Sequence, residues 1–420
     1  MFNHKTTLLA SFGSGLEYFD FVTFALLAPY LNLLFFPHDH HAIGLIKTFG
    51  LFALGYLARP IGGVFFGMLS DTFGRKKIFL WVIALIGFST TAIALLPTYS
   101  HVGMLAPILL LAMRLLQGLS FGAELPSALV FVAEHAKPTK RGQLCGILIG
   151  TVSLGNSLAA LICYLLTRTL TQAHMLSIGW RLPFLVGGLL AFINYFTRRS
   201  LNETPLFRQQ IKSKKVYQPL ISLFKEHSRE IVQGCALLLF SAATIIVGLS
   251  LPAQLHLLYH FSLNTLYLSL SLASCVSIVA IPLLGAYSDK WGRKKLYLVA
   301  IITAIVSQCL LFLGLKMQTT WMLWVFMFGY QGGISLLAAC YFTLLTELFT
   351  TTTRVTGYAF CYNCIFAIIS FLPALAIYLI HRFSSTDPLM LILVGFGLLS
   401  LIGASMIDDK TGRSLQTVTN

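Results

Sequence analysis

The chain has 420 residues, of which 57% are hydrophobic and only 10% are charged, and its mean hydropathy is +0.81. Because a soluble globular domain carries about 25% charged residues, this composition excludes a protein whose whole surface faces water. The formal net charge of +15 is compatible with nucleic-acid binding. The basic residues, however, gather in loops between apolar segments, so we expect membrane lipid and not nucleic acid as the partner of this charge.

From the N-terminus onward the chain is a series of long apolar runs. A run of about 20 apolar residues crosses a bilayer as a helix. The sequence predicts twelve such spans, at residues 7–35, 43–69, 78–97, 103–133, 142–169, 179–197, 230–257, 262–287, 295–315, 320–347, 355–380 and 387–407. The first run is too long for a cleavable signal peptide, so we expect it to remain as a span. The predicted fold class is an all-α membrane protein.

Two clusters of potential metal ligands lie along these runs. His38, Asp39, His40 and His41 follow the first span, and we interpret them as a short hydrated turn. Cys361 and Cys364 lie inside an apolar run, where a thiol usually serves as a packing residue. We therefore expect no metal site.

One charged loop occurs twice in the chain. Residues 67–77 are Gly-Met-Leu-Ser-Asp-Thr-Phe-Gly-Arg-Lys-Lys, and residues 285–295 are Gly-Ala-Tyr-Ser-Asp-Lys-Trp-Gly-Arg-Lys-Lys. Each copy lies between two apolar runs at the same place in the hydropathy pattern. This repeat predicts two pseudo-symmetric six-helix bundles, residues 1–200 and 229–420. We expect residues 201–228 to form a polar, basic linker on the inner membrane face.

Each residue type in the repeated loop has a physical reason. The first glycine lets neighbouring helices approach closely, and the second permits a turn. The aspartate is able to pair with a cation or with the start of a facing helix. A loop that only anchors the topology is sufficient for one copy, whereas two matching copies favour a gate. The paired positions are Gly67 and Gly285, Asp71 and Asp289, Gly74 and Gly292, and Arg75 and Arg293.

The basic residues also indicate the orientation in the membrane. If the N-terminus is cytoplasmic, 22 of the 29 lysines and arginines fall in cytoplasmic segments. Cytoplasmic loops are enriched in these residues, so we expect both termini in the cytoplasm.

The repeated loop resembles the signature of the major facilitator superfamily. Further segments resemble its metabolite:proton symporters: Leu16-Glu17-Tyr18-Phe19-Asp20-Phe21, Arg59-Pro60 with Gly62-Gly63, Arg114 with Gln117-Gly118 and Glu124, Arg141-Gly142, Gly179-Trp180-Arg181 with Pro183-Phe184, and Glu203-Thr204-Pro205 with Phe207. Tyr18 stands where the family usually has tryptophan, and Ala123 replaces a glycine. The resemblance extends over nearly the whole chain.

The resemblance implies a secondary transporter of the bacterial cytoplasmic membrane that works by alternating access. It implies a monomer with no cofactor other than the proton as coupling ion. Its substrate would be a small zwitterionic or anionic metabolite, such as proline or betaine, or a di- or tricarboxylate. Spans 1, 4, 7 and 10 would line the central cavity.

Charged residues inside the predicted spans are the leading candidates for proton coupling and substrate binding, because a charge in a membrane is costly and usually functional. A carboxylate in an apolar cavity binds a proton more readily, whereas a neighbouring arginine favours its charged form. A static network of ion pairs is the alternative role. The charged candidates are Glu17, Asp20, Arg59, Arg114 and Glu124, and the neutral Gln117 joins them because it shares a motif with Arg114.

The second half has almost no charge in spans 7 and 10. We expect it to supply hydroxyl, amide and aromatic groups to the cavity from Ser241, Gln254, Tyr330 and Gln331. At the expected outer interface, Trp180 suits an aromatic anchor, and Arg181 suits either an anchor or a partner for an outer carboxylate.

Three other functions remain as alternatives to uptake. Proton-coupled efflux or exchange is disfavoured because residues 146–156 of span 5 contain no proline. A non-transporting nutrient sensor would need a long signalling segment, which we do not find. An enzyme is least favoured, since no nucleophile and base occur in a recognisable pattern.

Overall fold

The computed structural model describes residues 4–73, 75–122, 124–199, 219–350, 353–413 and 415, so most of the expected linker, residues 201–218, lies outside the described ranges. The described residues form helices and loops without a strand, so the predicted all-α class is confirmed. The helices are α1 (His4–Leu26), α2 (Ala28–Phe35), α3 (His41–Phe73), α4 (Arg75–Leu95), α5 (Tyr99–Val102), α6 (Leu105–Phe121), α7 (Glu124–His135), η1 (Pro138–Lys140), α8 (Arg141–Thr169), α9 (Gln172–His174), η2 (Met175–Gly179), α10 (Arg181–Arg199), α12 (Pro219–Glu226), α13 (Ser228–Tyr259), α14 (Leu263–Trp291), α15 (Arg293–Leu315), α16 (Thr320–Leu348), α17 (Arg354–Ile369), α18 (Leu372–Phe383) and α19 (Asp387–Ser405).

The apolar helices are consistent with twelve spans. Within the described ranges, ten helical segments are long and apolar enough to cross a bilayer. The pair formed by Gly13–Leu26 and Ala28–Phe35 makes an eleventh span with a bend of 58°, and the shorter apolar helix Leu80–Leu95 accounts for the twelfth. Pro29 lies in the first turn of α2, where its missing N–H costs no helical hydrogen bond, so a new helix begins there easily.

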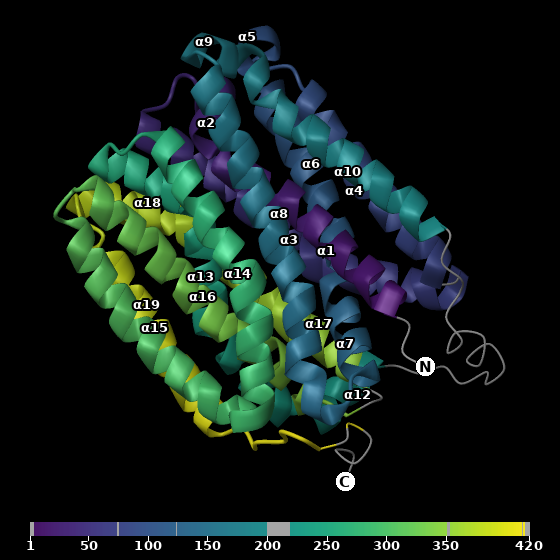
Figure 1. Cartoon of the computed structure of the whole chain (residues 1–420). Helices are drawn as coiled ribbons and strands as arrows, with labels where there is room; N and C mark the ends of the chain where they lie inside the picture. Colours follow the sequence, from purple (N-terminus) through teal and green to yellow (C-terminus); the bar gives the residue numbers. More distant parts are fainter. Residues whose placement is uncertain are drawn as a thin grey trace.

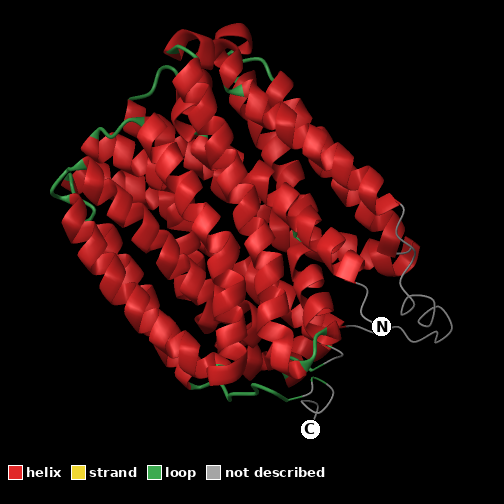
Figure 2. Ribbon diagram, viewed as in Figure 1, coloured by secondary structure: helices red, strands yellow, loops and turns green. Residues whose placement is uncertain are grey.

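The lateral faces of the molecule are apolar. In Figure 1, α4 and α10 lie on one flank and α15 and α19 on the opposite flank, while Figure 2 shows the loops gathered at the two ends of the helices. Large apolar side chains are exposed on these four helices, which suits contact with lipid chains. They include Trp81, Phe88, Phe192, Phe196, Ile302, Leu310, Leu398 and Ile402.

A seam between α8 and α14 joins the two halves of the chain. Near one end, a Cβ atom on Gly142 would lie 2.5 Å from the carbonyl oxygen of Gly285. Further along, the hydroxyl of Ser157 donates to the carbonyl of Ser271 over 3.0 Å. The order of these contacts makes the helices antiparallel. The close backbone approach requires glycine at both positions of the first pair.

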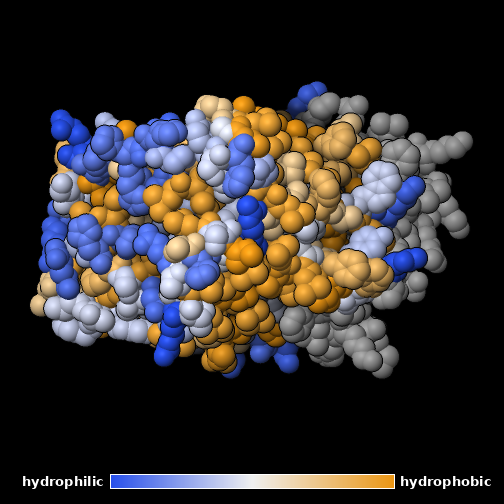
Figure 3. Space-filling model, turned by 90° about the horizontal axis from the view of Figure 1, so that it is seen from above, coloured by the Kyte–Doolittle hydropathy of each residue, from blue (hydrophilic) through white to orange (hydrophobic). Residues whose placement is uncertain are grey.

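The end that carries α5 and α9 differs from expectation at Trp180. Figure 3 views this end and shows polar side chains gathered toward one side, with apolar side chains among them and over much of the rest of the face. Trp180 is fully buried and packs edge-on against Phe35 at 5.7 Å, so it is not the exposed interfacial anchor that we expected. Arg181 donates to the carbonyls of Ala94 (2.5 Å) and Leu96 (2.8 Å) and pairs with no carboxylate of the described residues. The tryptophan is buried because the π-helical turn η2 positions it at the start of α10, against the end of α2.

Candidate functional site

A series of hydrogen bonds connects Arg114 to Asp20 inside the first half. Nη1 of Arg114 donates to Oε1 of Gln117 (2.8 Å), and Nε2 of Gln117 donates to Oγ1 of Thr90 (2.7 Å). The Thr90 hydroxyl then donates to Oδ2 of Asp20 over 3.0 Å. All four side chains are buried. A cation and a carboxylate are thus linked through two neutral groups, each of which donates in the same direction. We call this series the α1–α4–α6 network.

The carboxylate at the end of this network points into the first half. A Cβ atom on Gly187 of α10 would lie only 1.7 Å from Oδ1 of Asp20. That oxygen is buried and accepts no hydrogen bond within the described residues. Asp20 is therefore enclosed by α4 and α10, and the absence of a side chain at Gly187 makes room for it.

Aromatic rings surround Arg59 and Arg114 of the first half. The Arg114 guanidinium lies 4.1 Å from the ring centroid of Phe24 and 4.6 Å from that of Phe21. The Arg59 guanidinium lies 3.9 Å from Tyr56 and 4.1 Å from the same Phe21. A desolvated cation–π contact is worth about 2 kcal/mol, which offsets part of the cost of burying these cations. Phe21 touches both arginines and follows Asp20 in α1, so it connects Arg59 to the α1–α4–α6 network.

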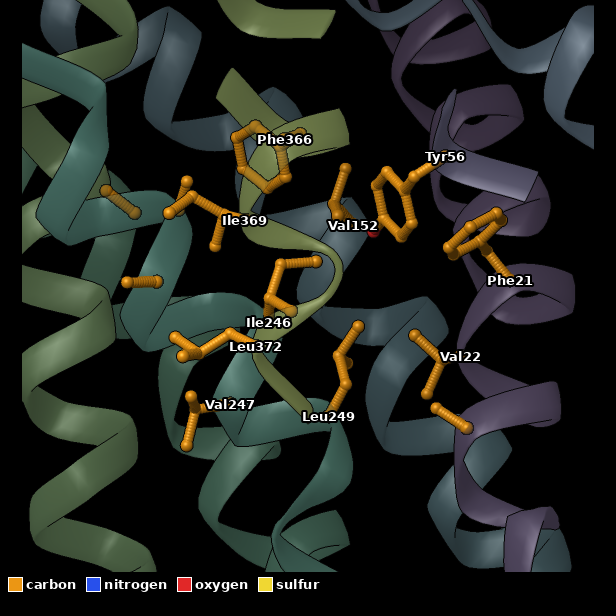
Figure 4. Close-up of a cluster of buried hydrophobic side chains, with 14 of the residues drawn as sticks. Phe21, Val22, Tyr56, Val152, Ile246, Val247, Leu249, Phe366, Ile369 and Leu372 are labelled. Carbon is orange, nitrogen blue, oxygen red and sulfur yellow. The ribbon is translucent and has the colours of Figure 1, made fainter. Parts of the chain in front are cut away.

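A central cavity of about 60 Å³ lies between the two halves. At roughly 10–15 Å³ per water, it holds a few water molecules. Figure 4 shows part of its apolar wall, with Val152 of the first half and Leu249 and Phe366 of the second. The described residues that line it include no charged side chain, and its polar members are Tyr18, Ser153, Asn156, Gln331, Tyr341 and Tyr362.

The proton-coupling candidates whose side chains the structure describes therefore lie outside the wall of this cavity. Asp20, Arg114 and Gln117 belong to the α1–α4–α6 network, Arg59 lies among aromatic rings, and Glu124 is buried at the start of α7. The side chain of Glu17 lies outside the described residues. The rotation of α1 about its axis explains why Asp20 lies outside the cavity wall, because the face of α1 that carries Asp20 packs against α4 and α10.

Of the second-half candidates, Gln331 alone lines this cavity. Ser241 bonds Tyr297 (2.9 Å), and Gln254 donates to Ser250 (2.6 Å). The hydroxyl of Tyr330 donates to the carbonyl of Thr244 over 2.8 Å. These three side chains satisfy polar groups inside the second bundle and do not reach the cavity.

Five further polar residues line the cavity besides Gln331. They are Tyr18, Ser153, Asn156, Tyr341 and Tyr362. Ser153 and Asn156 lie in span 5, which was not expected to line the cavity. Neutral residues of this kind carry no signal in hydropathy or charge, so only the packing of the helices reveals them.

The second copy of the repeated loop joins the two halves at the expected cytoplasmic end. The Asp289 carboxylate accepts the backbone N–H groups of Gly142 (2.8 Å) and Gln143 (3.0 Å), which begin α8 of the first half. It also pairs with Arg293 in its own half. Gly292 makes the turn with φ = 103°, a value that favours glycine. In the first copy, the side chains of Asp71 and Arg75, the surroundings of Gly67 and the whole of Gly74 lie outside the described residues.

A second set of contacts crosses between the halves in both directions. Arg141 of the first half pairs with Glu347 of the second, and Arg354 of the second half pairs with Glu134 of the first at 2.6 Å. Glu347 also accepts from Arg293 at 2.7 Å. We call the two ion pairs Arg141–Glu347 and Arg354–Glu134 the crossed pair. The sequence signal for it is that the interval between Glu134 and Arg141 equals the interval between Glu347 and Arg354. Of these four residues, only Arg141 belongs to a motif that we had singled out.

The segment after α19 lies across this crossed pair. The carbonyl of Arg413 accepts from Nη2 of Arg141 (3.3 Å), and the carbonyl of Leu415 accepts from Nη2 of Arg354 (3.3 Å). The hydroxyl of Thr411 accepts the backbone N–H of Arg293 over 2.9 Å. This C-terminal segment therefore contacts arginines from both halves.

Helices with apolar flanks, a seam between two halves and a charged contact layer at one end define a helical membrane protein built from two packed halves. The sequence profile of the Major Facilitator Superfamily matches residues 10–371 and 231–417. The chain belongs to this superfamily.

Several bacterial relatives are similar in sequence. The proline/betaine transporter of Salmonella typhimurium is 29% identical over 432 residues, covering 99% of this chain and 85% of the relative. A Staphylococcus aureus protein named for proline/betaine transport is 36% identical over 303 residues, or 70% of this chain. That match spans only 64% of the Staphylococcus aureus protein's length.

Solved structures of sugar transporters share the fold. The proton:xylose symporter XylE bound to 6-bromo-6-deoxy-D-glucose superimposes with a TM-score of 0.77 at 17% identity, covering 98% of this chain and 97% of that one. A D-xylose-proton symporter gives a TM-score of 0.76 at 18% identity, with 98% of each chain covered. At this identity the likeness concerns the fold alone.

Proposed function

We propose that the protein is a proton-coupled symporter that imports a small organic metabolite into a bacterial cell by alternating access. In this proposal residues 1–200 and 229–420 are the two moving bundles, both termini are cytoplasmic, and the proton is the coupling ion. The preferred substrates are zwitterions of the proline and betaine type. The names of the relatives support this class, and di- or tricarboxylates are the second choice.

The α1–α4–α6 network carries the proposal for proton coupling. Three successive donors end on the Asp20 carboxylate, inside a membrane bundle where a charge needs compensation. A proton on Asp20 would cancel its charge and weaken its hydrogen bond from Thr90, and through Gln117 this change would reach Arg114. Loss of the compensating negative charge would then alter the pairing of a buried guanidinium. The network thus offers a route from proton binding to a rearrangement of α1 against α6.

The cavity supports a substrate without net charge. Its described lining supplies hydroxyls, amides and aromatic faces but no basic side chain that would neutralise a di- or tricarboxylate. An uncompensated anion in such an environment is strongly disfavoured. A zwitterion cancels most of its own field, and aromatic faces stabilise its cationic end.

Uptake by the purified protein in proteoliposomes tests the proposed function. Labelled proline, glycine betaine, 2-oxoglutarate and citrate are offered with and without an inward proton gradient, and sodium replaces potassium in a parallel series. We expect a zwitterion to accumulate under the proton gradient and to leave when a protonophore is added. Accumulation that survives the protonophore, or that requires sodium, contradicts proton coupling.

Three variants locate the coupling residue. Asp20→Asn is expected to abolish gradient-driven accumulation and to retain exchange of substrate across the membrane, because exchange needs no net proton movement. Glu17→Gln and Glu124→Gln are tested in parallel, and Asp387→Asn serves as the control because its carboxylate is half-exposed in a surface ion pair. If Asp20→Asn, Glu17→Gln and Glu124→Gln all keep gradient-driven accumulation, the assignment of coupling to these acids is wrong.

A further inference from the structure

Two side chains that line the central cavity each carry a buried polar atom without a hydrogen-bond partner among the described residues. Asn156 on α8 donates through Nδ2 to the hydroxyl of Ser274 (2.8 Å), but its Oδ1 is buried and accepts nothing within the described residues. The hydroxyl of Tyr341 on α16 is also buried and has no partner among them. Both side chains line the cavity. Buried polar groups are nearly always paired, so two exceptions in one wall require an explanation.

The two groups are chemically complementary and come from opposite halves. An amide oxygen only accepts hydrogen bonds, whereas a phenolic hydroxyl also donates. Together they match a small molecule that offers an N–H to Asn156 and an oxygen to Tyr341. A ligand held by both would bridge α8 of the first bundle and α16 of the second, which is where a cargo must be held while the halves rock.

The aromatic faces of the cavity do not distinguish a cationic nitrogen that carries hydrogen atoms from one that is fully methylated. Tyr341 and Phe342 lie 4.0 Å apart between ring centroids, and Tyr362 and Phe366 lie 4.4 Å apart. Such faces attract a cationic nitrogen whether it carries hydrogen atoms or methyl groups. The Asn156 oxygen, by contrast, gains a partner only from a nitrogen that retains hydrogen. A fully methylated nitrogen would leave the Asn156 oxygen buried without a hydrogen bond, and this loss would weaken binding of the methylated ligand strongly.

We propose that Asn156 and Tyr341 determine the substrate specificity of the transporter. Asn156 selects a small amino- or imino-acid zwitterion that retains at least one N–H over its fully methylated analogue, and Tyr341 binds the carboxylate. This inference rests on the proposed function, and it concerns which zwitterion the central cavity accepts.

A methylation series of one ligand tests the role of Asn156. L-proline, N-methyl-L-proline and N,N-dimethyl-L-proline carry two, one and no N–H on the charged nitrogen. Binding of each to the full chain in lipid nanodiscs is measured by calorimetry, which does not depend on transport. For the wild type we expect Kd to rise about tenfold at the step that removes the last N–H. In Asn156→Leu, proline should bind about tenfold more weakly, and this step should disappear.

The chain offers matched controls for both positions. Tyr358 also has a buried hydroxyl without a partner among the described residues, but it does not line the cavity. Tyr341→Phe should weaken all three ligands about tenfold, whereas Tyr358→Phe should change Kd by less than about twofold. Gln308 is the control for Asn156. It also donates to a hydroxyl, that of Thr244 at 3.5 Å, and its amide oxygen accepts nothing from the described residues. Gln308 does not line the central cavity. Gln308→Met should therefore retain the wild-type step.

The outcomes separate this inference from the proposed function. If the wild type binds the series but Asn156→Leu keeps the step at the last N–H, or Tyr358→Phe weakens binding as much as Tyr341→Phe, the specificity assignment is overturned and the transport proposal stands. If the wild type binds none of the three ligands, the specificity assignment and the choice of zwitterion are both wrong. Proton-driven uptake of another substrate class would then show whether the transport proposal survives.

Discussion

Arg141 and Arg354 occupy equivalent positions in the two halves and make equivalent contacts. Each donates its Nε to a backbone carbonyl eight residues earlier, that of Ala133 (3.2 Å) or Thr346 (3.1 Å), and extends Nη1 to a glutamate of the other half. Each Nη2 donates to a carbonyl of the C-terminal segment. The duplicated halves therefore hold each other through exchanged ion pairs, and these pairs have to separate if the halves are to part at this end.

Glu134 and Glu347 should contribute unequally to holding the two halves together at the expected cytoplasmic end, which we call the closed end. Glu347 is buried and accepts from two arginines, so Glu347→Gln removes the compensation for buried cations and should destabilise the closed end by about 3–5 kcal/mol. The Glu134 side chain is 30% exposed, so water replaces much of its contribution and Glu134→Gln should cost about 1 kcal/mol. The measurement is the labelling rate of Ser153→Cys, a cavity position, by an impermeant thiol reagent in inverted vesicles that carry the protein without its native cysteines. Equal labelling rates in the two variants would contradict this ranking.

The glycine contact in the seam predicts a steric effect on stability. A Cβ atom on Gly285 would lie 2.4 Å from the carbonyl oxygen of Gly142, so Gly285→Ala forces α8 and α14 apart and should cost about 1–3 kcal/mol. A methyl group on Gly395 of α19 would have no neighbour within 4 Å among the described residues, so Gly395→Ala should be neutral or stabilise its helix by up to about 1 kcal/mol. Thermal unfolding in detergent measures both, and a Gly285→Ala protein as stable as Gly395→Ala would refute the close contact.

Gly187 should be required for the position of the Asp20 carboxylate. A methyl group there would lie 1.7 Å from Oδ1 of Asp20, so Gly187→Ala must displace the carboxylate from Thr90. We expect gradient-driven uptake to fall as far as in Asp20→Asn, at least about tenfold, since a displacement that costs about 1.4 kcal/mol already changes an equilibrium tenfold. Uptake and exchange in proteoliposomes are compared, with Gly395→Ala as the control. Normal gradient-driven uptake in Gly187→Ala would show that the carboxylate position is not needed.

The C-terminal segment should stabilise the closed end. Truncation after Asp409 removes the two carbonyls that accept from Arg141 and Arg354, together with Thr411. Hydrogen bonds to charged groups contribute about 1.5–3 kcal/mol each, and water replaces part of this at the surface, so we expect a net loss of about 2 kcal/mol. Truncation after Gln416 keeps both carbonyls as peptide carbonyls and is the matched control. The same labelling assay should show faster access to Ser153→Cys only in the shorter protein, and equal rates would rule out a role for these contacts.

The spans could be located from the sequence because hydropathy is a local property. The predicted runs are consistent with the helices of the described ranges, although the helix of the third run, Leu80–Leu95, is shorter than the other spans. The break in span 1 at Leu27 adds a bend that hydropathy does not register. The repeated loop predicted the duplication for a similar reason, since both copies carry the same residues at the same place. The crossed pair left a comparable signal in the equal spacing of Glu134 and Arg141 and of Glu347 and Arg354. The repeated Glu–Arg spacing could have been found in the sequence, but the sequence does not show which arginine pairs with which glutamate.

The direction of each side chain could not be predicted from the sequence. Asp20 and Arg114 were selected because buried charges are costly, and Gln117 because it shares a motif with Arg114; all three are indeed buried. They were expected to face the cavity, yet they face one another through Thr90, a residue with no distinguishing pattern around it. The cavity wall instead contains neutral residues such as Asn156, whose proposed role depends on an oxygen left without a partner among the described residues. Neither property is encoded in residue type or spacing.

The sequence by itself determined the membrane class, the number of apolar runs, the duplication and the superfamily, because these depend on composition, run length and repeated motifs. Tertiary structure alone decided which arginine meets which glutamate, where Asp20 points and which polar atoms of the described cavity wall remain unpaired. Those outcomes depend on how each helix is rotated against its neighbours. A rotation of one residue about a helix axis turns a side chain by about 100°, enough to move it from a cavity into a bundle interior.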